Sequence, residues 1–548
     1  MSRSRLLVSL LVLACIGLPA GLTAAAPRCD GWRVGADAES IAPSAAQLKE
    51  GLYLGGYGIA SGTVGLGAAT VRVTGGRLAT GVMNGDLGAV SVRALALSDG
   101  CGRNTIVLGD LDNQGMFAAY KPNPADPTSA RPGIDDIRAD VAKATGVPAE
   151  NLVISSDHSH GGQDLIGAWG FVPDDYLRFV HDQAVKAFTR AIAGMQRARI
   201  TEGAVQTPGS CDPARILNNQ FDCTDPVIGR VDDELRVLQA RAVRGGAVIA
   251  TVVNFAAHAT VMGSGNTLVS PDWPGVVARY LEERYGGVGM TLVADVGRSQ
   301  PNRQDCTATE LKAALAHAAG AYDVDPRQGS ESCKLSKYSR TVMSYAEPAI
   351  ARATPLTGSG IQSTSYFIHD ASDSVALFGA DYAGDAVGIP IARRVTPPYF
   401  AGMVIGTWVS VFRVGTLLIT TNPGEAYPNV REQLMAQVSG PRRFWTIGLA
   451  NDQLGYLIAP TPEGYPKPIF YSMFDGDINN PATWTPDPIG NDNFFFNVSP
   501  TIGDHVMCTQ VRGVSDLHVA GWSVNPASKC ALWLNEPNTA SEGFPPPL

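Results

Sequence analysis

The sequence is poor in charge and in long apolar runs, and both shortages limit what the protein can be. Only 17% of its 548 residues are charged, and acidic residues outnumber basic ones by 51 to 42. The net charge of −9 and the lack of an evident basic patch along the chain argue against nucleic acid as a partner, because phosphate binding needs clustered lysine and arginine. Beyond Ala26, no apolar run approaches the roughly 18 to 20 residues that span a bilayer, so we expect a soluble mature chain.

Motifs of several hydrolase and metal-binding classes are also absent. The chain has no His-Glu-x-x-His segment and no Cys-x-x-Cys spacing, and its run Gly263-Ser264-Gly265 is too short for a Gly-x-Ser-x-Gly turn. These absences exclude a zincin, and they argue against a cysteine-held metal, thioredoxin-like chemistry and an α/β-hydrolase serine. No internal repeat is present, which excludes a solenoid.

The N-terminal segment has the order of a secretory signal peptide. Arg3 and Arg5 precede the apolar run Leu6–Leu18, and small residues end the segment at Ala26. A lipoprotein would carry its lipid on Cys15, but the chain stays apolar beyond that residue, where a processed lipoprotein turns polar. We therefore interpret residues 1–26 as a signal peptide and expect a secreted, extracellular protein.

The cysteines fit an oxidising compartment. The chain has nine, and removing Cys15 with the signal peptide leaves an even eight, which favours disulfides. Connectivity does not follow from sequence, but pairing of neighbours gives short loops. We expect the pairs Cys29–Cys101, Cys211–Cys223, Cys306–Cys333 and Cys508–Cys530.

Short apolar runs alternate with amphipathic helical patterns along the chain. The predicted buried strands are Thr105–Leu108, Leu152–Ile154, Val248–Phe255, Thr291–Ala294 and Thr416–Thr420. The predicted helices are Ile134–Thr145, Asp175–Met195, Pro274–Tyr285, Leu311–Ala321 and Asn429–Val438. This alternation predicts an α/β fold with α+β additions: a mixed-sheet core, flanking helices and a short C-terminal appendage.

Polar side chains follow these strands at the points where they end, which is where open α/β sheets bind ligands. They are Asp110, His158, His160, His258, the segment Asp295–Asn302 and Glu425. The glycine-rich stretch Gly51–Gly67 lacks the flanking strand and helix of a phosphate loop, so we interpret it as glycine-bearing strands and turns.

The segment Ser155–Gly162 carries the sharpest chemical signal. Residues two apart in an extended segment face the same side, so His158 and His160 can point into one site. Two loop histidines bonded to backbone carbonyls are the alternative. With only eight histidines in the chain, a His-x-His pair directly after a buried strand favours a metal site.

His258 and Glu425 are candidates for further metal ligands. Each closes an apolar strand, and a carboxylate beside two imidazoles makes a donor set suited to zinc. Taken singly, His258 is equally well explained as a core histidine, and Glu425 as a favourable charge at a helix N-terminus.

Several blocks together resemble the neutral and alkaline non-lysosomal ceramidases, zinc amidases that cleave the N-acyl bond of ceramide. The blocks occur in the family's order from about Gly51 to Tyr471, which covers most of the mature chain. Ile154–Gly162 resembles the family's His-Thr-His stretch, and Pro423–Glu425 resembles its Pro-Gly-Glu motif. Phe255–Thr260 and Ser270–Gly275 resemble its Phe-Ala-x-His-x-Thr and Ser-Asp-x-x-Gly runs. Tyr456–Pro460, with Glu463, resembles its Tyr-Val-Thr-Thr-Pro-Glu segment.

This resemblance implies roles for individual residues. The implied ligands of one zinc ion per chain are His158, His258, Glu425 and Tyr456. His160 would stand beside the metal as a hydrogen-bonding or proton-transfer residue. Such a site is chemically coherent, because zinc lowers the pKa of a bound water to about 7 and polarises a carbonyl oxygen, and both effects promote amide hydrolysis. A core tyrosine that only donates a hydrogen bond is the alternative for Tyr456.

The chain departs from the family pattern in several places. The family's catalytic serine lies in Gly-Asp-Val-Ser-Pro-Asn, whereas Ala294–Asn302 has extra residues, and Ser299 is the nearest counterpart. A second site tyrosine corresponds to Tyr465 or Tyr471, and a substrate-pocket arginine to Arg215. The family usually ends in an immunoglobulin-like domain, whereas this chain ends 92 residues after Tyr456.

We therefore expect a catalytic domain over residues 27–475 and a shortened C-terminal region over residues 476–548. The expected activity is zinc-dependent hydrolysis of the amide bond of ceramide or a related N-acyl lipid, with contact to a membrane surface. Two rivals are a ceramidase-like hydrolase of another amide or ester, and a zinc-stabilised binding protein without turnover. Candidate aromatics for a lipid groove are Trp169, Phe171 and Phe494–Phe496, although such residues more often belong to an ordinary core.

Overall fold

The computed structural model describes most of the mature chain. The described residues are 31–57, 62–66, 69–73, 76–100, 104–120, 128–167, 169–170, 172–208, 219–220, 232–297, 299–358, 360–372, 395–399, 402–441, 443–458, 474–475, 485–486 and 502–531. Several predictions lie outside these residues: the signal peptide, the pairs Cys29–Cys101 and Cys211–Cys223, and residues Phe171, Arg215, Tyr465, Tyr471 and Phe494–Phe496. Within the described part, no helix is long and apolar enough to cross a membrane.

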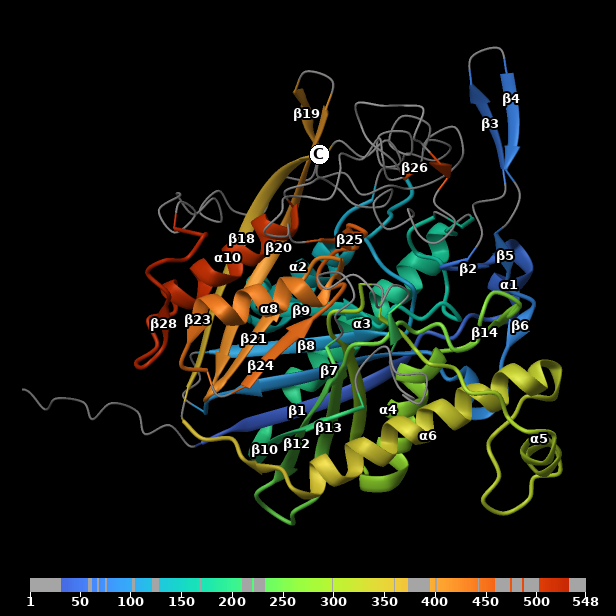
Figure 1. Ribbon diagram of the computed structural model, residues 1–548, viewed down its shortest axis with the longest axis horizontal. Helices are drawn as coiled ribbons and strands as arrows, with labels where there is room; N and C mark the ends of the chain where they lie inside the picture. The colour runs from blue at the N-terminus through green and yellow to red at the C-terminus, as the bar shows by residue number, and fades with distance from the viewer. Residues whose placement is uncertain are drawn as a thin grey trace, which may run out of the picture.

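The largest sheet among the described residues has nine strands and forms the base of the fold (Figure 1). In spatial order they are β15 (Val288–Val293), β13 (Val248–Phe255), β12 (Glu234–Ala242), β10 (Gln196–Gln206), β1 (Arg33–Ser40), β7 (Ser91–Ser98), β8 (Thr105–Leu111) and β9 (Leu152–Ser156), with β17 (Thr354–Pro355) paired to β10. The pairs β13–β15 and β8–β9 are parallel, and the others are antiparallel. The mixed sheet predicted from the sequence is confirmed.

Helices cover one face of this sheet. They are α2 (Ile134–Thr145), α3 (Asp174–Ala193), α4 (Asp272–Tyr285) and α6 (Gly329–Ala351). In α3 the buried residues recur every three or four positions, among them Val180, Ala184 and Phe188, so one stripe faces the sheet. Full burial of Phe188 contributes roughly 1.5–3 kcal/mol. Gly35 of β1 lets α3 approach closely, because a Cβ there would lie 2.1 Å from the Ala191 carbonyl oxygen.

A second sheet packs on the opposite face of the first. Its strands are β18 (Ile361–Ser372), β20 (Gly402–Val414), β21 (Leu417–Thr421) and β24 (Arg443–Ile447), with β19 (Val395–Tyr399) paired to β20. Phe412, Ile419 and Trp445 pack against Ile200 and Leu238 of the first sheet. The outer face of the second sheet carries α8 (Pro428–Gln437) and α10 (Ile502–Asp516). The layers therefore run helix, sheet, sheet, helix (Figure 1).

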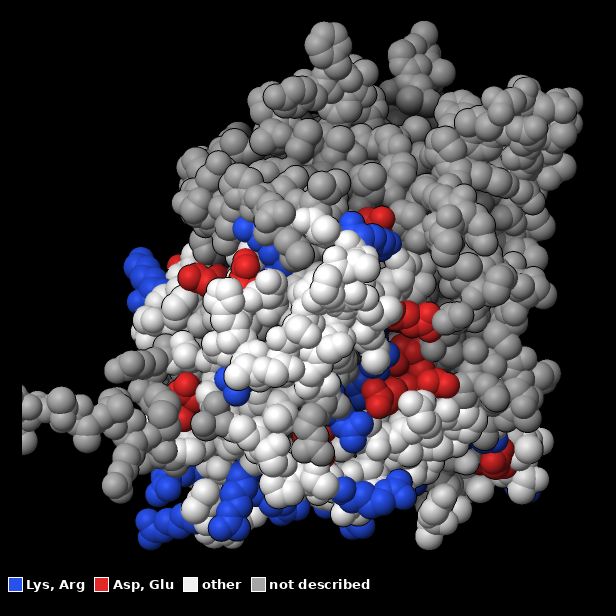
Figure 2. Space-filling view, turned by 60° about the vertical axis from the view of Figure 1, so that its left-hand side comes forward, with Lys and Arg blue, Asp and Glu red and all other residues white. Residues whose placement is uncertain are grey.

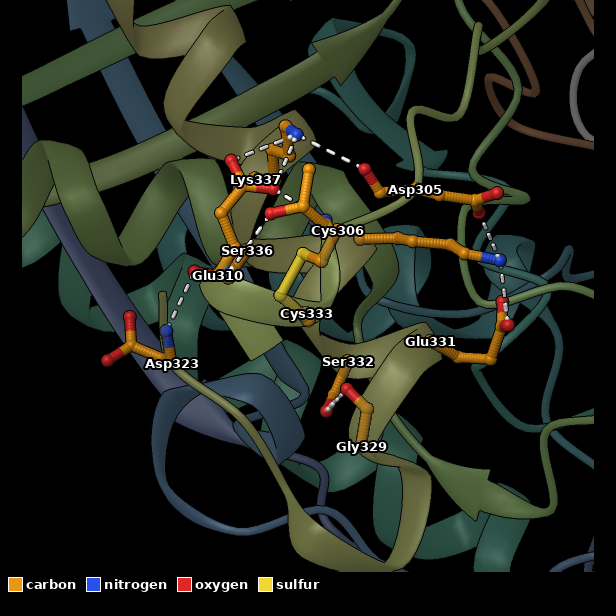
Figure 3. Close-up of a disulfide and its surroundings, with 12 residues drawn as sticks. Asp305, Cys306, Glu310, Asp323, Gly329, Glu331, Ser332, Cys333, Ser336 and Lys337 are labelled. Carbon is orange, nitrogen blue, oxygen red and sulfur yellow. Dashed lines mark hydrogen bonds and ion pairs between the residues drawn. A yellow bond between two sulfur atoms is a disulfide. The ribbon is translucent and has the colours of Figure 1, made fainter. Parts of the chain in front are cut away.

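Two of the predicted disulfides lie within the described residues, and both are confirmed. Cys306–Cys333 joins the segment before α5 (Ala308–Leu315) to α6, beside contacts of Lys337 with Glu310 and Asp305 (Figure 3). Cys508–Cys530 ties α10 to the segment that follows it. The described part of the C-terminal region is thus held against the second sheet; the boundary at residue 476 stays a prediction.

The predicted helix Leu311–Ala321 is wrong in its extent. The helix begins earlier, after an N-cap at Thr307 whose hydroxyl accepts a hydrogen bond from the Glu310 amide, and it ends at Leu315. His317 has a φ of 51°, a conformation that breaks a right-handed helix. The other four predicted helices are confirmed to within about two residues.

Candidate metal centre

The segments that follow strands β9 and β13 lie side by side at one end of the large sheet. His158 comes just after β9, and His258 just after β13. A parallel bridge between Ser159 and Ala259 joins these two segments, and the His160 amide donates to the Ala259 carbonyl oxygen over 2.9 Å. The polar residues that the sequence placed at strand ends therefore lie together at the carboxyl edge of the sheet.

The donor atoms of His158, His258 and Glu425 converge. Nε2 of His158 and Nε2 of His258 each lie 3.2 Å from Oε2 of Glu425. All three side chains are buried, with exposed fractions of 1%, 1% and 5%. The ring nitrogens of His158, His160 and His258 also lie within 4.8 Å of one another. Residues from three distant parts of the sequence thus share one small volume.

Backbone carbonyls fix how the two buried imidazoles present their nitrogens. Nδ1 of His158 donates to the Gln114 carbonyl oxygen over 2.8 Å, and Nδ1 of His258 donates to the Ser299 carbonyl oxygen over 3.1 Å. Nδ1 of each ring therefore carries a proton, and Nε2 is the nitrogen that lies beside Glu425. Metal-binding histidines commonly donate their other ring N–H to a backbone carbonyl in this way.

The convergent atoms fit a divalent cation. Nε2 of His158 and Nε2 of His258 each lie 3.2 Å from the same carboxylate oxygen, so one cation bound between the three atoms could contact all of them. Burial alone would raise the pKa of Glu425, but the adjacent His158 and His258 outweigh it and hold that pKa well below its usual range. Imidazole nitrogens with a carboxylate oxygen form a donor set typical of zinc.

Tyr456 lies beside this group. Strand β25 (Tyr456–Leu457) pairs in parallel with β22 (Glu425–Ala426), so that Tyr456 stands opposite Glu425. The Tyr456 ring centre lies 6.5 Å from that of His258. Gln453, in the turn before β25, donates from Nε2 to Oε1 of Glu425 over 3.1 Å. This bond leaves the other carboxylate oxygen, Oε2, directed at the two histidines.

His160 stands at the edge of the group and is less deeply buried than His158. Its Nε2 lies 3.3 Å from Nε2 of His158, and the ring of Tyr57 meets its ring edge-on at 4.9 Å. Burial, together with the neighbouring histidines, lowers the pKa of His160 well below its usual range. Gly56 touches the same ring, since a Cβ there would lie 2.0 Å from Nδ1 of His160. His160 is therefore a neutral imidazole held in a narrow space.

Arg77 holds the backbone around His160 through hydrogen bonds. Its guanidinium donates to the His160 carbonyl oxygen over 2.6 Å, to the Asn266 carbonyl oxygen over 3.0 Å and to the Gly55 carbonyl oxygen. It also covers the Tyr57 ring at 4.7 Å. Because the group is buried, its pKa falls to about 10. Sequence analysis did not identify Arg77 or Gln453, because both act on backbone or ligand atoms from turns without a motif.

Ser299 reaches the centre through its backbone. It opens β16 (Ser299–Gln300), and its carbonyl oxygen accepts from both the amide and Nδ1 of His258. Its hydroxyl oxygen is buried and has no hydrogen-bond partner among the described residues. The structure thus brings Ser299 to the histidines, although the segment differs from the motif it resembles.

Backbone strain gathers where His158 meets the turn after β24. His158, Leu449 and Asn451 have φ values of 62°, 45° and 66°, which residues other than glycine rarely adopt. Asn451 accepts from the Ile154 amide over 3.0 Å, and the Ser156 amide donates to the Leu449 carbonyl oxygen over 3.1 Å. These bonds hold the strained turns in place, as is common at functional sites.

A buried carboxylate cluster underlies the His158 turn. Arg93 pairs with Asp112 at 2.7 Å and with Asp110 at 3.7 Å, and Asp157 accepts from the Ser159 amide over 2.9 Å. Burial, followed by repulsion from Asp112, raises the pKa values of Asp110 and Asp157 well above their usual range. The cluster supports the segment that carries His158.

Comparisons with known proteins support the fold. No protein-family model matches the chain, and neither does any curated protein sequence. Among solved structures, neutral ceramidase from Pseudomonas aeruginosa matches with a TM-score of 0.57 and 15% identity, covering 88% of this chain and 74% of that chain. A ceramidase complexed with C2 matches with the same TM-score and coverage at 14% identity. The fold expected from the sequence resemblance is confirmed.

Proposed function

We propose that this chain, which has the fold of neutral ceramidase, is a zinc-dependent hydrolase that cleaves the amide bond of ceramide or a related N-acyl lipid. The products are a fatty acid and a sphingoid base. The observation that carries the proposal is the convergence of His158, His258 and Glu425, in which both Nε2 atoms lie 3.2 Å from one carboxylate oxygen. That the structural matches are a neutral ceramidase and a ceramidase complexed with C2 supports the substrate class.

The proposed ligands are His158, His258, Glu425 and Tyr456. When bound, a zinc ion supplies an activated water and draws electrons from the carbonyl oxygen of the amide. The protein's own part is to orient the two imidazoles, which the carbonyl oxygens of Gln114 and Ser299 support.

His160 is the proposed proton-transfer residue. A neutral imidazole accepts a proton during attack on the acyl carbon and delivers it to the departing amine nitrogen. The lowered pKa of His160 favours transfer to the amine, because a weakly held proton leaves readily. Its position beside the ligands, less buried than they are, gives it access to a substrate.

Ser299 is proposed to bind the substrate near the reacting carbonyl. Its unpartnered, buried hydroxyl has hydrogen-bonding capacity that a substrate oxygen would satisfy. Tyr471 and Arg215 complete the proposed catalytic set. We further propose export through the signal peptide, which the two disulfides support, and a catalytic domain over residues 27–475.

Hydrolysis of ceramide by the zinc-loaded mature chain, measured beside simple N-acyl amides and esters, tests the proposal. We expect fatty acid release from ceramide in the wild type, and loss of at least about 100-fold in His160→Gln with zinc still bound. If only esters or short amides were hydrolysed, the proposed substrate class would be wrong and these compounds would take its place. Zinc binding without any turnover would identify a binding protein.

A further inference from the structure

Exposed arginines gather at one end of the strands of the large sheet, the end that lies farthest from the metal centre. Figure 2 shows lysine and arginine side chains grouped along the lower edge of the molecule. The residues that we call the arginine strip are Arg33, Arg197, Arg199, Arg241, Arg244, Arg284 and Arg352, all exposed. The strip is not evident along the sequence, because it is assembled from five separate segments.

Strand register sets the four central arginines side by side. Arg33 of β1 is the cross-strand partner of Arg197 in β10, and Arg199 is the partner of Arg241 in β12. Residues directly opposite in antiparallel strands point to the same face, as do residues two apart in one strand. Arg33, Arg197, Arg199 and Arg241 therefore share the face that carries the helices. Arg244 joins them, because the Val243 amide donates to the Arg197 carbonyl oxygen over 2.9 Å.

A hollow of about 770 Å³ continues the strip toward α4 and α6. Its floor includes Thr201, Gln239 and Arg241 of the sheet, and its wall includes Arg284 at the end of α4. Arg352 directly precedes Ala353, another lining residue. The arginines thus lead into a recess between helix ends rather than across a flat surface.

Structural stabilisation does not explain this arrangement. Like charges directly opposite on neighbouring strands lower the stability of a sheet. Among the described residues, Arg284 alone of the seven has a carboxylate partner within ion-pair distance, Glu347 at 3.6 Å. Six of the seven arginines therefore lack a carboxylate partner among the described residues, in a chain whose net charge is −9.

The strip and the metal centre occupy opposite ends of the same strands. β13 begins at Val248, beside the hairpin that carries Arg244, and ends at Phe255, just before His258. Eight extended residues span about 26 Å. A partner bound at the strip leaves the metal centre accessible.

We propose that the arginine strip binds a linear polyanion whose repeating unit is a phosphate group. The strip presents guanidinium groups, whose fork suits bidentate contact with phosphate oxygens. A flexible chain can follow the strip into the recess beside Arg241 and Arg284. The strip therefore tethers the enzyme to a phosphate polymer, with the metal centre directed away from it.

Titration of the full-length mature protein with inorganic polyphosphate, at several salt concentrations, tests this proposal. We expect binding that weakens as salt rises, and about tenfold weaker binding in Arg199→Gln/Arg241→Gln and in Arg33→Gln/Arg197→Gln, each with a salt slope smaller by about 1.5. The matched control Lys143→Gln/Lys312→Gln removes the same charge from exposed positions outside the strip, and it should bind as the wild type does. Thermal melting confirms that each variant is folded.

Three outcomes overturn the proposal. Equal weakening in the control and the strip variants would mean that net charge alone controls binding. Tighter binding to vesicles of phosphatidylglycerol, lost in the strip variants, would assign the strip to a membrane surface. Tighter binding to oligodeoxythymidylate than to polyphosphate of equal charge would assign it to nucleic acid.

Discussion

His258 and Glu425 lie 167 residues apart in the sequence, and their Nε2 and Oε2 atoms are 3.2 Å apart in the fold. Each closes or follows a strand of a different sheet, so the contact forms only when the two sheets pack face to face. Any change that loosens this packing is expected to weaken the metal centre before it disrupts either sheet.

A substitution at Gly56 tests whether activity depends on the narrow space around the His160 ring. We expect Gly56→Ala to displace the imidazole, because the new Cβ would lie 2.0 Å from Nδ1 of His160, and to lower kcat at least about tenfold while zinc stays bound. Gly85→Ala is the matched control, since Gly85 also has a positive φ, of 56° against 85°, and nothing lies within 4 Å of the added Cβ. Equal losses of activity in both variants would mean that backbone strain, rather than contact with His160, is responsible.

A substitution at Gln453 tests whether its hydrogen bond orients the Glu425 carboxylate for metal binding. Gln453→Leu removes the hydrogen bond to Oε1, and we expect zinc affinity to fall about 10- to 100-fold, measured by competition with a chelator. Gln206→Leu, at an exposed position at the end of β10, should leave the affinity unchanged. Unaltered zinc affinity in Gln453→Leu would show that the carboxylate is held without this bond.

Asp295 is expected to make the protein less stable as the pH rises toward 7. Burial, with repulsion from Asp232, raises the pKa of Asp295 to about 7. The folded state therefore holds this proton more tightly than the unfolded state does, and stability falls between about pH 4 and pH 7, by on the order of 3–4 kcal/mol from this group. Asp295→Asn should flatten that part of the profile of unfolding free energy against pH. An unchanged slope would show that other groups cause it.

The Cys306–Cys333 disulfide is expected to stabilise the fold without affecting the metal centre. A bridge that closes a loop of 27 residues contributes about 3–4 kcal/mol in the chain-entropy model. Cys306→Ser/Cys333→Ser should lower the midpoint of thermal unfolding and leave the zinc content unchanged. Loss of zinc in a variant that is still folded would mean that α6 positions the site directly.

Much of the fold could be predicted, because strands such as β9 and β13 are apolar runs buried on both faces. The long helix α6 could not, because its buried face includes Ser332, Ser336 and Ser339, so it lacks a clear apolar stripe. β10 was missed for another reason: its buried positions include the adjacent residues Glu202 and Gly203, so its apolar alternation is incomplete.

The candidate site was predicted where a motif carried it. His158 and His160 share a short segment after a strand, and the blocks around His258 and Glu425 completed the set. Gln453 and Arg77 carry no such signal, since their roles depend on which carbonyl or carboxylate oxygen the fold brings within reach.

The most direct test of the central claim is the zinc content of the purified mature chain, measured by mass spectrometry in the wild type and in His258→Ala. The account predicts one zinc ion per wild-type chain and almost none in folded His258→Ala. Equal zinc content in the two proteins, or none in an active wild type, would contradict it.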